Sequence, residues 1–171
     1  MKLILASKSG VRKNILDKNK INCEVIPSNI DEDQVKESLI SEKATPKLIS
    51  KNLAELKANK ISRKYPDRLV LGADSVIDLE SKLISKPKSR EEALQNLLKL
   101  NGKKHYLISS VCLSKNGSMI WHYTDTSTLI MKNLKLDELK SYLNKIKDEE
   151  LYAYGVYQIE ANGKSLFSKI D

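Results

Sequence analysis

The stretch "LILASKSGVRKNIL", residues 3–16, joins an apolar run to a helical pattern through a short turn of serine, lysine and glycine. Residues 3–6 are all apolar, which is typical of a buried strand, and residues 11–18 carry apolar side chains at helical spacing. The first N–H groups of a helix have no partner within the helix and lie at the positive end of its dipole. The stretch therefore predicts a strand, turn and helix whose turn can bind an anion.

This turn favours an anion site, because Ser9 and Gly10 lead directly into the helix N-terminus, Arg12 follows in its first turn and Lys8 adds charge at the rim. The plainer alternative is an ordinary serine cap followed by an arginine on the surface. A short Ser/Gly turn is far less specific than a Walker motif, so the turn alone leaves both interpretations open.

The composition is that of one globular domain. The chain has 171 residues, of which 40% are hydrophobic, enough for a core without disulfide or metal staples. Only Met1 and Lys2 precede the first apolar run. No run approaches the roughly 20 residues of a membrane span, so we expect neither a signal peptide nor a membrane partner. Cys23 and Cys112 lie in apolar alternation without a C-x-x-C pair, which favours buried, reduced thiols in a cytoplasmic protein.

The net charge of +8 raises the question of nucleic-acid binding. Only four of the 30 basic residues are arginines, the other 26 are lysines interleaved with acidic residues, and aromatic residues make up 5% of the chain. Proteins that read bases rely on arginine forks and stacked aromatics, which this pattern lacks. We therefore expect no nucleic-acid partner. The simplest explanation of the positive charge is a composition rich in lysine. The functional alternative is that the charge attracts an anionic substrate.

Strand and helix patterns alternate through the first half of the chain. Strands are expected at residues 3–6, 23–27 and 69–79, and helices at residues 11–18, 35–40 and 46–61. Pro46 suits the first turn of the last of these helices.

A hairpin dominates the second half. Ser89 and Glu92 have capping-box spacing at the start of a helix that Gly102 ends, and the Asn116-Gly117 pair predicts a tight turn. The remaining patterns predict hairpin strands at 105–114 and 119–131, a helix at 136–146 and a strand at 164–170. The fold expected from these elements is a single mixed α/β domain with a twisted central sheet flanked by helices.

Asp74 lies in the strand expected at residues 69–79, where the small or polar residues 72–75 interrupt the apolar run. A carboxylate there is costly unless it binds a cation or transfers a proton. The alternative is a residue in a strand bulge that bonds to the backbone. Lys57 and Lys86 would each, taken alone, be ordinary solvated lysines.

Taken together, these groups suit one kind of chemistry. One or two acids beside several cations are what phosphoanhydride hydrolysis requires, since a metal is held by carboxylates and positive charge faces the phosphates. No Ser/His/Asp set can be assembled, because His105 and His122 both lie in strand patterns away from any nucleophile, and we expect both to be structural.

Five stretches with recognisable motifs follow one another along most of the chain. They are "LILASKSGVRKNIL", "NIDED", "LAELKANKI", "LGADSVI" and "ISKPKSREEALQNLLKLNGKKHYLISSVCL". In the same order they resemble motifs of the Maf family of nucleoside triphosphate pyrophosphatases. These are an L-A-S-x-S-x-x-R opening, an I-D/E-E step, an L-A-x-x-K-A helix, a G-A-D-T/S/Q-V strand and a K-P-x-x-x-x-E-A-x-x-x-L-x-x-L-x-G-x-x-H segment.

The resemblance implies a fold of the Maf and inosine triphosphatase type. It also implies a metal-dependent cut between the α- and β-phosphates of a nucleoside triphosphate, which gives a nucleoside monophosphate and pyrophosphate. Asp74 matches the catalytic acid, as general base or metal ligand, and Glu32 matches a second carboxylate that helps to hold Mg²⁺ or Mn²⁺. The resemblance further implies a homodimer, and it places substrate contacts at Ser7, Ser9, Arg12, Lys57, Ser75 and Lys86.

The C-terminal part departs from the family's pattern. Many members carry D-K-A-G-A-Y-G-I-Q-G where this chain has "YAYGVYQIEANG", so Tyr152 and Ala153 replace an Asp-Lys pair and Glu160 replaces the glutamine. Val11 stands where one branch has arginine and another tryptophan. A carboxylate can accept two hydrogen bonds from guanine but is repelled by the acceptors of uracil and thymine. We therefore expect Glu160 to favour guanine-type or modified purine triphosphates; the alternative is that it points to solvent.

Family members continue past "SLFSKID" into a strand end and a last helix, so we expect a single domain over residues 1–171 that lacks this segment. That expectation motivates a second hypothesis, a catalytically weak nucleotide-binding protein that acts through a partner in cell-division control. A third hypothesis is a basic nucleic-acid-binding domain, which salt-dependent duplex binding without any effect of triphosphates would support.

Overall fold

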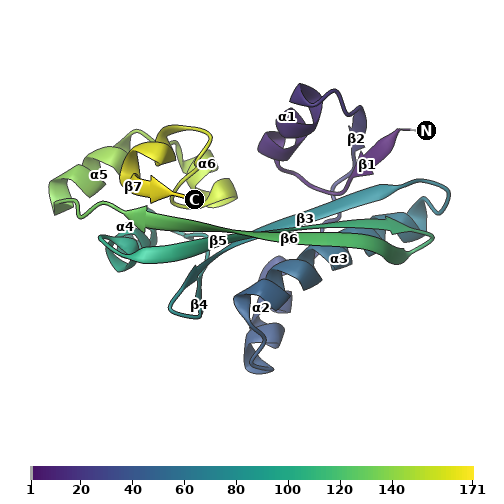
Figure 1. Cartoon of the computed structure of the whole chain (residues 1–171), viewed down its shortest axis with the longest axis horizontal. Coiled ribbons are helices and arrows are strands. Elements are labelled where there is room, and N and C mark those ends of the chain that lie inside the picture. Colours follow the sequence, from purple (N-terminus) through teal and green to yellow (C-terminus); the bar gives the residue numbers. More distant parts are fainter. Residues whose placement is uncertain (1) are drawn as a thin grey trace. The chain divides into compact units, whose positions relative to one another are not determined.

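The computed structural model describes residues 2–171. Contacts within the chain group into two compact units: one runs to Val76 and includes Ile108–Asp125, and the other comprises Ile77–Leu107 and Thr126–Asp171. One mixed sheet has the strand order β2-β1-β3-β5-β6-β7, with β4 paired to β3. Its three long strands, each of which contributes residues to both units, are β3 (Val70–Leu79), β5 (Lys104–Lys115) and β6 (Ser118–Met131) (Figure 1).

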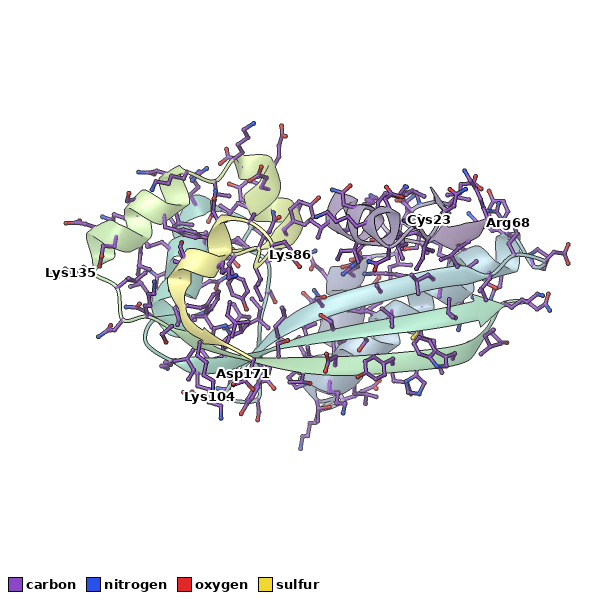
Figure 2. All side chains as sticks on the ribbon, turned by 45° about the horizontal axis from the view of Figure 1, so that its top comes forward. Cys23, Arg68, Lys86, Lys104, Lys135 and Asp171 are labelled. Carbon is purple, nitrogen blue, oxygen red and sulfur yellow. The ribbon has the colours of Figure 1, made fainter. Side chains whose placement is uncertain are left out.

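The first unit is built on parallel strands. β1 (Leu3–Leu5) lies between β2 (Cys23–Val25) and β3, with Leu3 opposite Cys23 and Ile4 opposite Val70. The guanidinium of Arg68, labelled in Figure 2, bonds to a Glu24 carboxylate oxygen at 2.7 Å and to the carbonyl of Lys2, which ties the starts of these three strands together.

Three helices complete this unit: α1 (Gly10–Lys18), α2 (Glu32–Ser41) and α3 (Pro46–Lys64). Figure 1 shows α1 and α3 on opposite sides of β1 and β3. The core on the α3 side consists of buried small and branched side chains, namely Ile4, Ala6, Ala54, Ala58, Ile61, Val70 and Cys112. The small residues bring the helix close to the sheet.

Gly72 marks the closest approach of α3 to β3. A Cβ atom at this position would lie 2.1 Å from the carbonyl oxygen of Ala54 and 2.9 Å from the Cβ of Ala58, so only glycine fits. The helix therefore rests directly on the strand backbone beside Asp74.

The second unit pairs β4 (Lys82–Ile84) antiparallel to the end of β3 and β7 (Phe167–Ile170) antiparallel to the end of β6. Its helices are α4 (Arg90–Leu100), α5 (Leu136–Asn144) and α6 (Asp148–Tyr154), followed by a 3₁₀ turn, η1 (Asn162–Leu166). The Arg90 guanidinium pairs with Asp148 and donates to the carbonyls of Leu143 and Ile146, which satisfies the free end of α5. The core of this unit includes Leu97, Leu100, Leu129, Met131, Leu139 and Phe167.

Most predicted elements are confirmed, and with them the mixed α/β fold. The hairpin turn has positive φ at both Asn116 (52°) and Gly117 (77°), as a tight two-residue hairpin requires. Ser89 caps α4 by accepting from the N–H of Glu92 at 3.1 Å. Cys23 and Cys112 are buried and free. Among residues 2–171, no helix combines the length and apolar character needed to cross a membrane.

Three details differ from expectation. The small or polar residues 72–75 do not interrupt the strand, because β3 runs unbroken from Val70 to Leu79. The strand expected at 164–170 begins only at Phe167, because residues 162–166 close a 3₁₀ turn in which Ser165 Oγ donates to the Asn162 carbonyl. Finally, β4 and α6 have no counterpart among the predicted elements.

Candidate active site

The turn after β1 holds its arginine in place. Ser9 caps α1 by accepting from the N–H of Arg12 at 3.3 Å. The buried Ser7 Oγ accepts from Arg12 Nη1 at 3.1 Å and from the N–H of Ser9 at 3.1 Å. The serine cap of the plainer interpretation is present, but the arginine folds back over the turn. Guanidinium, hydroxyls and helix N-terminus thus lie together, as anion binding requires.

Two carboxylates lie on either side of a buried lysine in the same unit. Lys57 Nζ, on α3, is 2.7 Å from Glu32 Oε1 and 3.1 Å from Asp74 Oδ1. It also donates to the carbonyl of Ala73 at 3.3 Å. An ammonium has three N–H donors, and these three oxygens can take them all. Lys57 therefore compensates the charge of the carboxylate pair; a contact from Lys57 to substrate phosphate stays a prediction.

Asp74 lies on β3 with only 4% of its surface exposed. Burial raises the pKa of its carboxyl, and the nearby charges of Lys57, Lys36 and Arg12 partly oppose that rise. Lys36 lies one helical turn after Glu32 on α2 and so on the same face of that helix. Arginine, lysines and carboxylates of the first unit therefore act on one another electrostatically around Asp74.

One oxygen of this carboxyl has no protein partner. Asp74 Oδ2 is buried and accepts no hydrogen bond from the residues the structure describes. An unpartnered buried carboxylate oxygen is costly, so it suits a ligand that arrives from outside, a cation or a reacting water.

The donor set fits a magnesium-type cation. Mg²⁺ prefers hard oxygen ligands and is commonly bound through one or two carboxylates together with substrate phosphates. Glu32 and the free oxygen of Asp74 supply such a pair. A group of three or more His, Cys, Asp or Glu side chains that could hold a metal is not found among residues 2–171.

Ser75 points to the other face of β3, since successive strand residues alternate. Its hydroxyl is exposed and lies 2.9 Å from that of Ser109 on β5. The structure therefore places Ser75 on the face of the strand opposite the carboxylate pair, although Ser75 directly follows Asp74 in sequence.

Two further predicted site residues, Lys86 and Glu160, belong to the second unit. Lys86, labelled in Figure 2, is exposed in the loop between β4 and α4. Its Cγ is the nearest atom, at 3.9 Å, to where a Cβ of Gly155 would lie, so its stem passes close to the end of α6. Glu160 is exposed between α6 and η1. Their roles in binding stay predictions.

The two histidines differ in burial. His105 is fully buried, and its Nε2 lies 3.1 Å from the hydroxyl of Tyr157, as expected of a structural histidine. His122 lies on an exposed part of β6, so it is not part of the core.

Sequence reasoning missed two polar residues of the first unit, Ser50 and Ser109. Ser50 Oγ donates to the backbone carbonyl of Asp74 at 3.1 Å. The available signal was its spacing, since it lies seven residues, or two helical turns, before Lys57 on the mostly apolar buried face of this helix. Ser109 had no signal, because a hydroxyl in a strand pattern is ordinary.

Named relatives match nearly the whole chain. The chain is 66% identical over 169 residues to a protein of Pelagibacter ubique named nucleoside triphosphate pyrophosphatase, across 99% of this chain and 87% of the relative. It is 40% identical over 169 residues to a protein of Bartonella quintana named 7-methyl-GTP pyrophosphatase, across 99% and 84%.

Solved structures match in fold. The Ham1 protein of Staphylococcus aureus superposes with a TM-score of 0.52 at 16% identity, over 79% of this chain and 74% of that one. A HAM1 protein of Coxiella burnetii gives 0.50 at 14%, over 78% and 74%. The sequence model of the Maf family, described as Maf-like protein, matches residues 2–171. This chain therefore belongs to the Maf family.

Proposed function

We propose that the chain is a nucleoside triphosphate pyrophosphatase, which hydrolyses the bond between the α- and β-phosphates and releases a nucleoside monophosphate and pyrophosphate. The observation that carries the proposal is the buried Asp74 carboxyl, paired through one oxygen to Lys57 and unpartnered at the other. The activity given in the names of the relatives supports the same reaction.

The turn after β1 would bind the phosphates. Ser9 caps the N–H of Arg12, the other N–H groups of the first turn of α1 would face the anion, and the Arg12 guanidinium, which donates to Ser7, adds donors and charge. Most of the catalytic effect in phosphoryl transfer comes from placed positive charge and from orientation of the reacting groups.

Asp74 would act on the attacking water, either by accepting its proton at Oδ2 or by holding the cation that activates it. The water oxygen bonds to the α-phosphorus, the bond to the bridging oxygen breaks, and that oxygen leaves with the pyrophosphate. A divalent cation, Mg²⁺ or Mn²⁺, bound by Glu32 and Asp74 would neutralise phosphate charge and acidify the water. Lys57, paired with both carboxylates, holds them close together.

The test is a panel of purified nucleoside triphosphates with Mg²⁺, with Mn²⁺ and with a chelator. The proposal predicts metal-dependent release of pyrophosphate and monophosphate in equal amounts. Thermal protection by a nucleotide without any release of pyrophosphate would instead support the weakly active binding protein, and release of single phosphate would contradict the cleavage position.

We also propose a homodimer. Part of β6 exposes Ile120, Trp121 and Tyr123, with exposed fractions of 61%, 50% and 56%, and apolar side chains gathered on one strand are typical of an interaction surface. Light scattering after gel filtration tests this, and a monomeric mass at all concentrations would contradict it. The buried free thiols further support a cytoplasmic, reducing location.

A further inference from the structure

Asp74 is held by α3 at two places. Its carboxylate binds Lys57 at 3.1 Å, and its backbone carbonyl accepts from the hydroxyl of Ser50 at 3.1 Å. The two helix residues are seven positions apart and so lie on one face of α3. Ala54, which lies between them, and Ala58, which follows Lys57, touch β3 at Gly72.

The Ser50 hydroxyl is placed where it has little freedom. The residue is fully buried, and a second carbonyl, that of Ile108 on β5, is 3.5 Å away, a weaker contact. A hydroxyl has one proton, so it can serve one of these carbonyls at a time, and the shorter contact is to Asp74. A serine in a helix interior usually donates back to its own helix. Here it donates across to the strand.

This contact matters because it joins α3 to the strand residue that carries the carboxylate. The close contact at Gly72 sets how near α3 lies to β3. The hydrogen bond from Ser50 adds a directional restraint at residue 74 itself, because a hydrogen bond weakens steeply when its geometry is distorted.

We propose that Ser50 is a positioning residue for the pyrophosphatase reaction: its hydroxyl holds the backbone of Asp74 against α3, so that Asp74 Oδ2 stays aimed at the attacking water. The inference rests on the proposed function. Ser50 touches neither substrate nor metal in this account and acts only through Asp74.

The matched control lies on the same helix. Ser62 is also a fully buried serine of α3, and its Oγ accepts from the N–H of Gly117 at 2.9 Å, in the hairpin turn. Loss of either hydroxyl removes one hydrogen bond to a backbone group, at a similar cost of about 1–3 kcal/mol in stability. Only Ser50→Ala should also affect catalysis.

The experiment measures kcat and KM for the best nucleotide of the panel, with urea unfolding of each variant. We expect Ser50→Ala to lower kcat by about tenfold with KM changed less than about twofold, because small misplacements of reacting groups act mainly on the chemical step. Ser62→Ala should keep the wild-type kcat while losing comparable stability.

A second pair of variants keeps the test valid if Ser50→Ala folds poorly. Ser50→Thr and Ser50→Val add nearly the same volume and differ in whether a hydroxyl is present. We expect the threonine variant to retain at least about fivefold more kcat than the valine variant.

The outcomes separate the two claims. If the wild type releases pyrophosphate while Ser50→Ala matches Ser62→Ala in kcat, or threonine and valine behave alike, the positioning role is wrong and the proposed function stands. If the wild type releases no pyrophosphate from any nucleotide, the proposed function fails and the positioning role fails with it.

Discussion

Replacement of Lys57 by methionine removes the cation between two carboxylates while keeping most of the side-chain volume. Breaking a buried charge pair by deleting one partner typically costs about 3–5 kcal/mol. The Glu32 side chain is 32% exposed, so solvent screens its half of the interaction. The Asp74 side chain is 5% exposed and carries most of the cost. We therefore expect a loss near the lower limit, about 3 kcal/mol, near neutral pH.

The loss should depend on pH in a defined direction. Burial already raises the pKa of Asp74 above its ordinary value of 3.8, and Lys57 is the largest influence that holds it down. Without Lys57 the pKa of the folded state rises further. A carboxyl whose pKa is raised by folding contributes stability below its unfolded pKa and loses it as the pH rises through the folded pKa. The destabilisation by Lys57→Met should therefore be larger at about pH 8 than at about pH 5.

Urea unfolding of the wild type, Lys57→Met and Lys60→Met at both pH values makes the measurement. Lys60 is the matched control, since it lies about one turn further along α3 and its ammonium donates to a backbone carbonyl, that of Asn29 at 3.1 Å. We expect its replacement to cost under about 1 kcal/mol at either pH. A Lys57→Met variant no less stable than Lys60→Met, or a penalty that does not change with pH, would refute the argument that Lys57 compensates a buried carboxylate.

Three further predictions concern separate parts of the chain. Arg12→Ala and Lys86→Ala should each lower kcat/KM for triphosphates, while Lys8→Ala at the rim has much less effect; equal effects in steady-state kinetics would indicate a diffuse field rather than a site. Glu160→Gln should narrow the preference for GTP and 7-methyl-GTP over UTP and dTTP, measured as kcat/KM ratios, and a wild-type preference for UTP or dTTP would exclude a role of Glu160 in reading the base. Burial lowers the pKa of His105, so its neutral form stabilises the fold at higher pH, and that contribution falls as the pH drops below the unfolded pKa of about 6.5. His105→Gln should therefore make the urea midpoint less sensitive to acid, and a pH dependence of the midpoint equal to that of the wild type would contradict this role of His105.

Local sequence patterns predict well those elements whose caps and turns are formed by residues close together in the sequence. The Ser9 cap, the Ser89 cap and the Asn116-Gly117 turn each depend on a few neighbouring residues and are confirmed. The β3–β4 hairpin was missed because its turn uses Glu80 and Ser81 at positive φ, 54° and 67°, where no glycine or asparagine marks it. Such a turn is strained locally and is held by strand pairing.

The site is harder to predict because its contacts join residues far apart in sequence. Asp74 is conspicuous as a carboxylate among apolar residues, whereas nothing in the surroundings of Lys57 indicates that it binds a strand 17 residues away. Ser50 reaches Asp74 across 24 residues for the same reason. Both contacts follow from the close packing of α3 on Gly72, a feature of three-dimensional structure.

The central claim is that the Asp74 carboxyl carries out hydrolysis of the α–β phosphoanhydride bond, and its most direct test is the rate of pyrophosphate release by the wild type and by Asp74→Asn. The asparagine keeps the size of the side chain but carries no negative charge and does not accept the proton, so we expect kcat to fall at least about a hundredfold with the fold intact, the usual scale for loss of a general base. Circular dichroism and urea unfolding check the fold of the variant. Turnover within a few-fold of the wild type, in a correctly folded variant, would contradict the account.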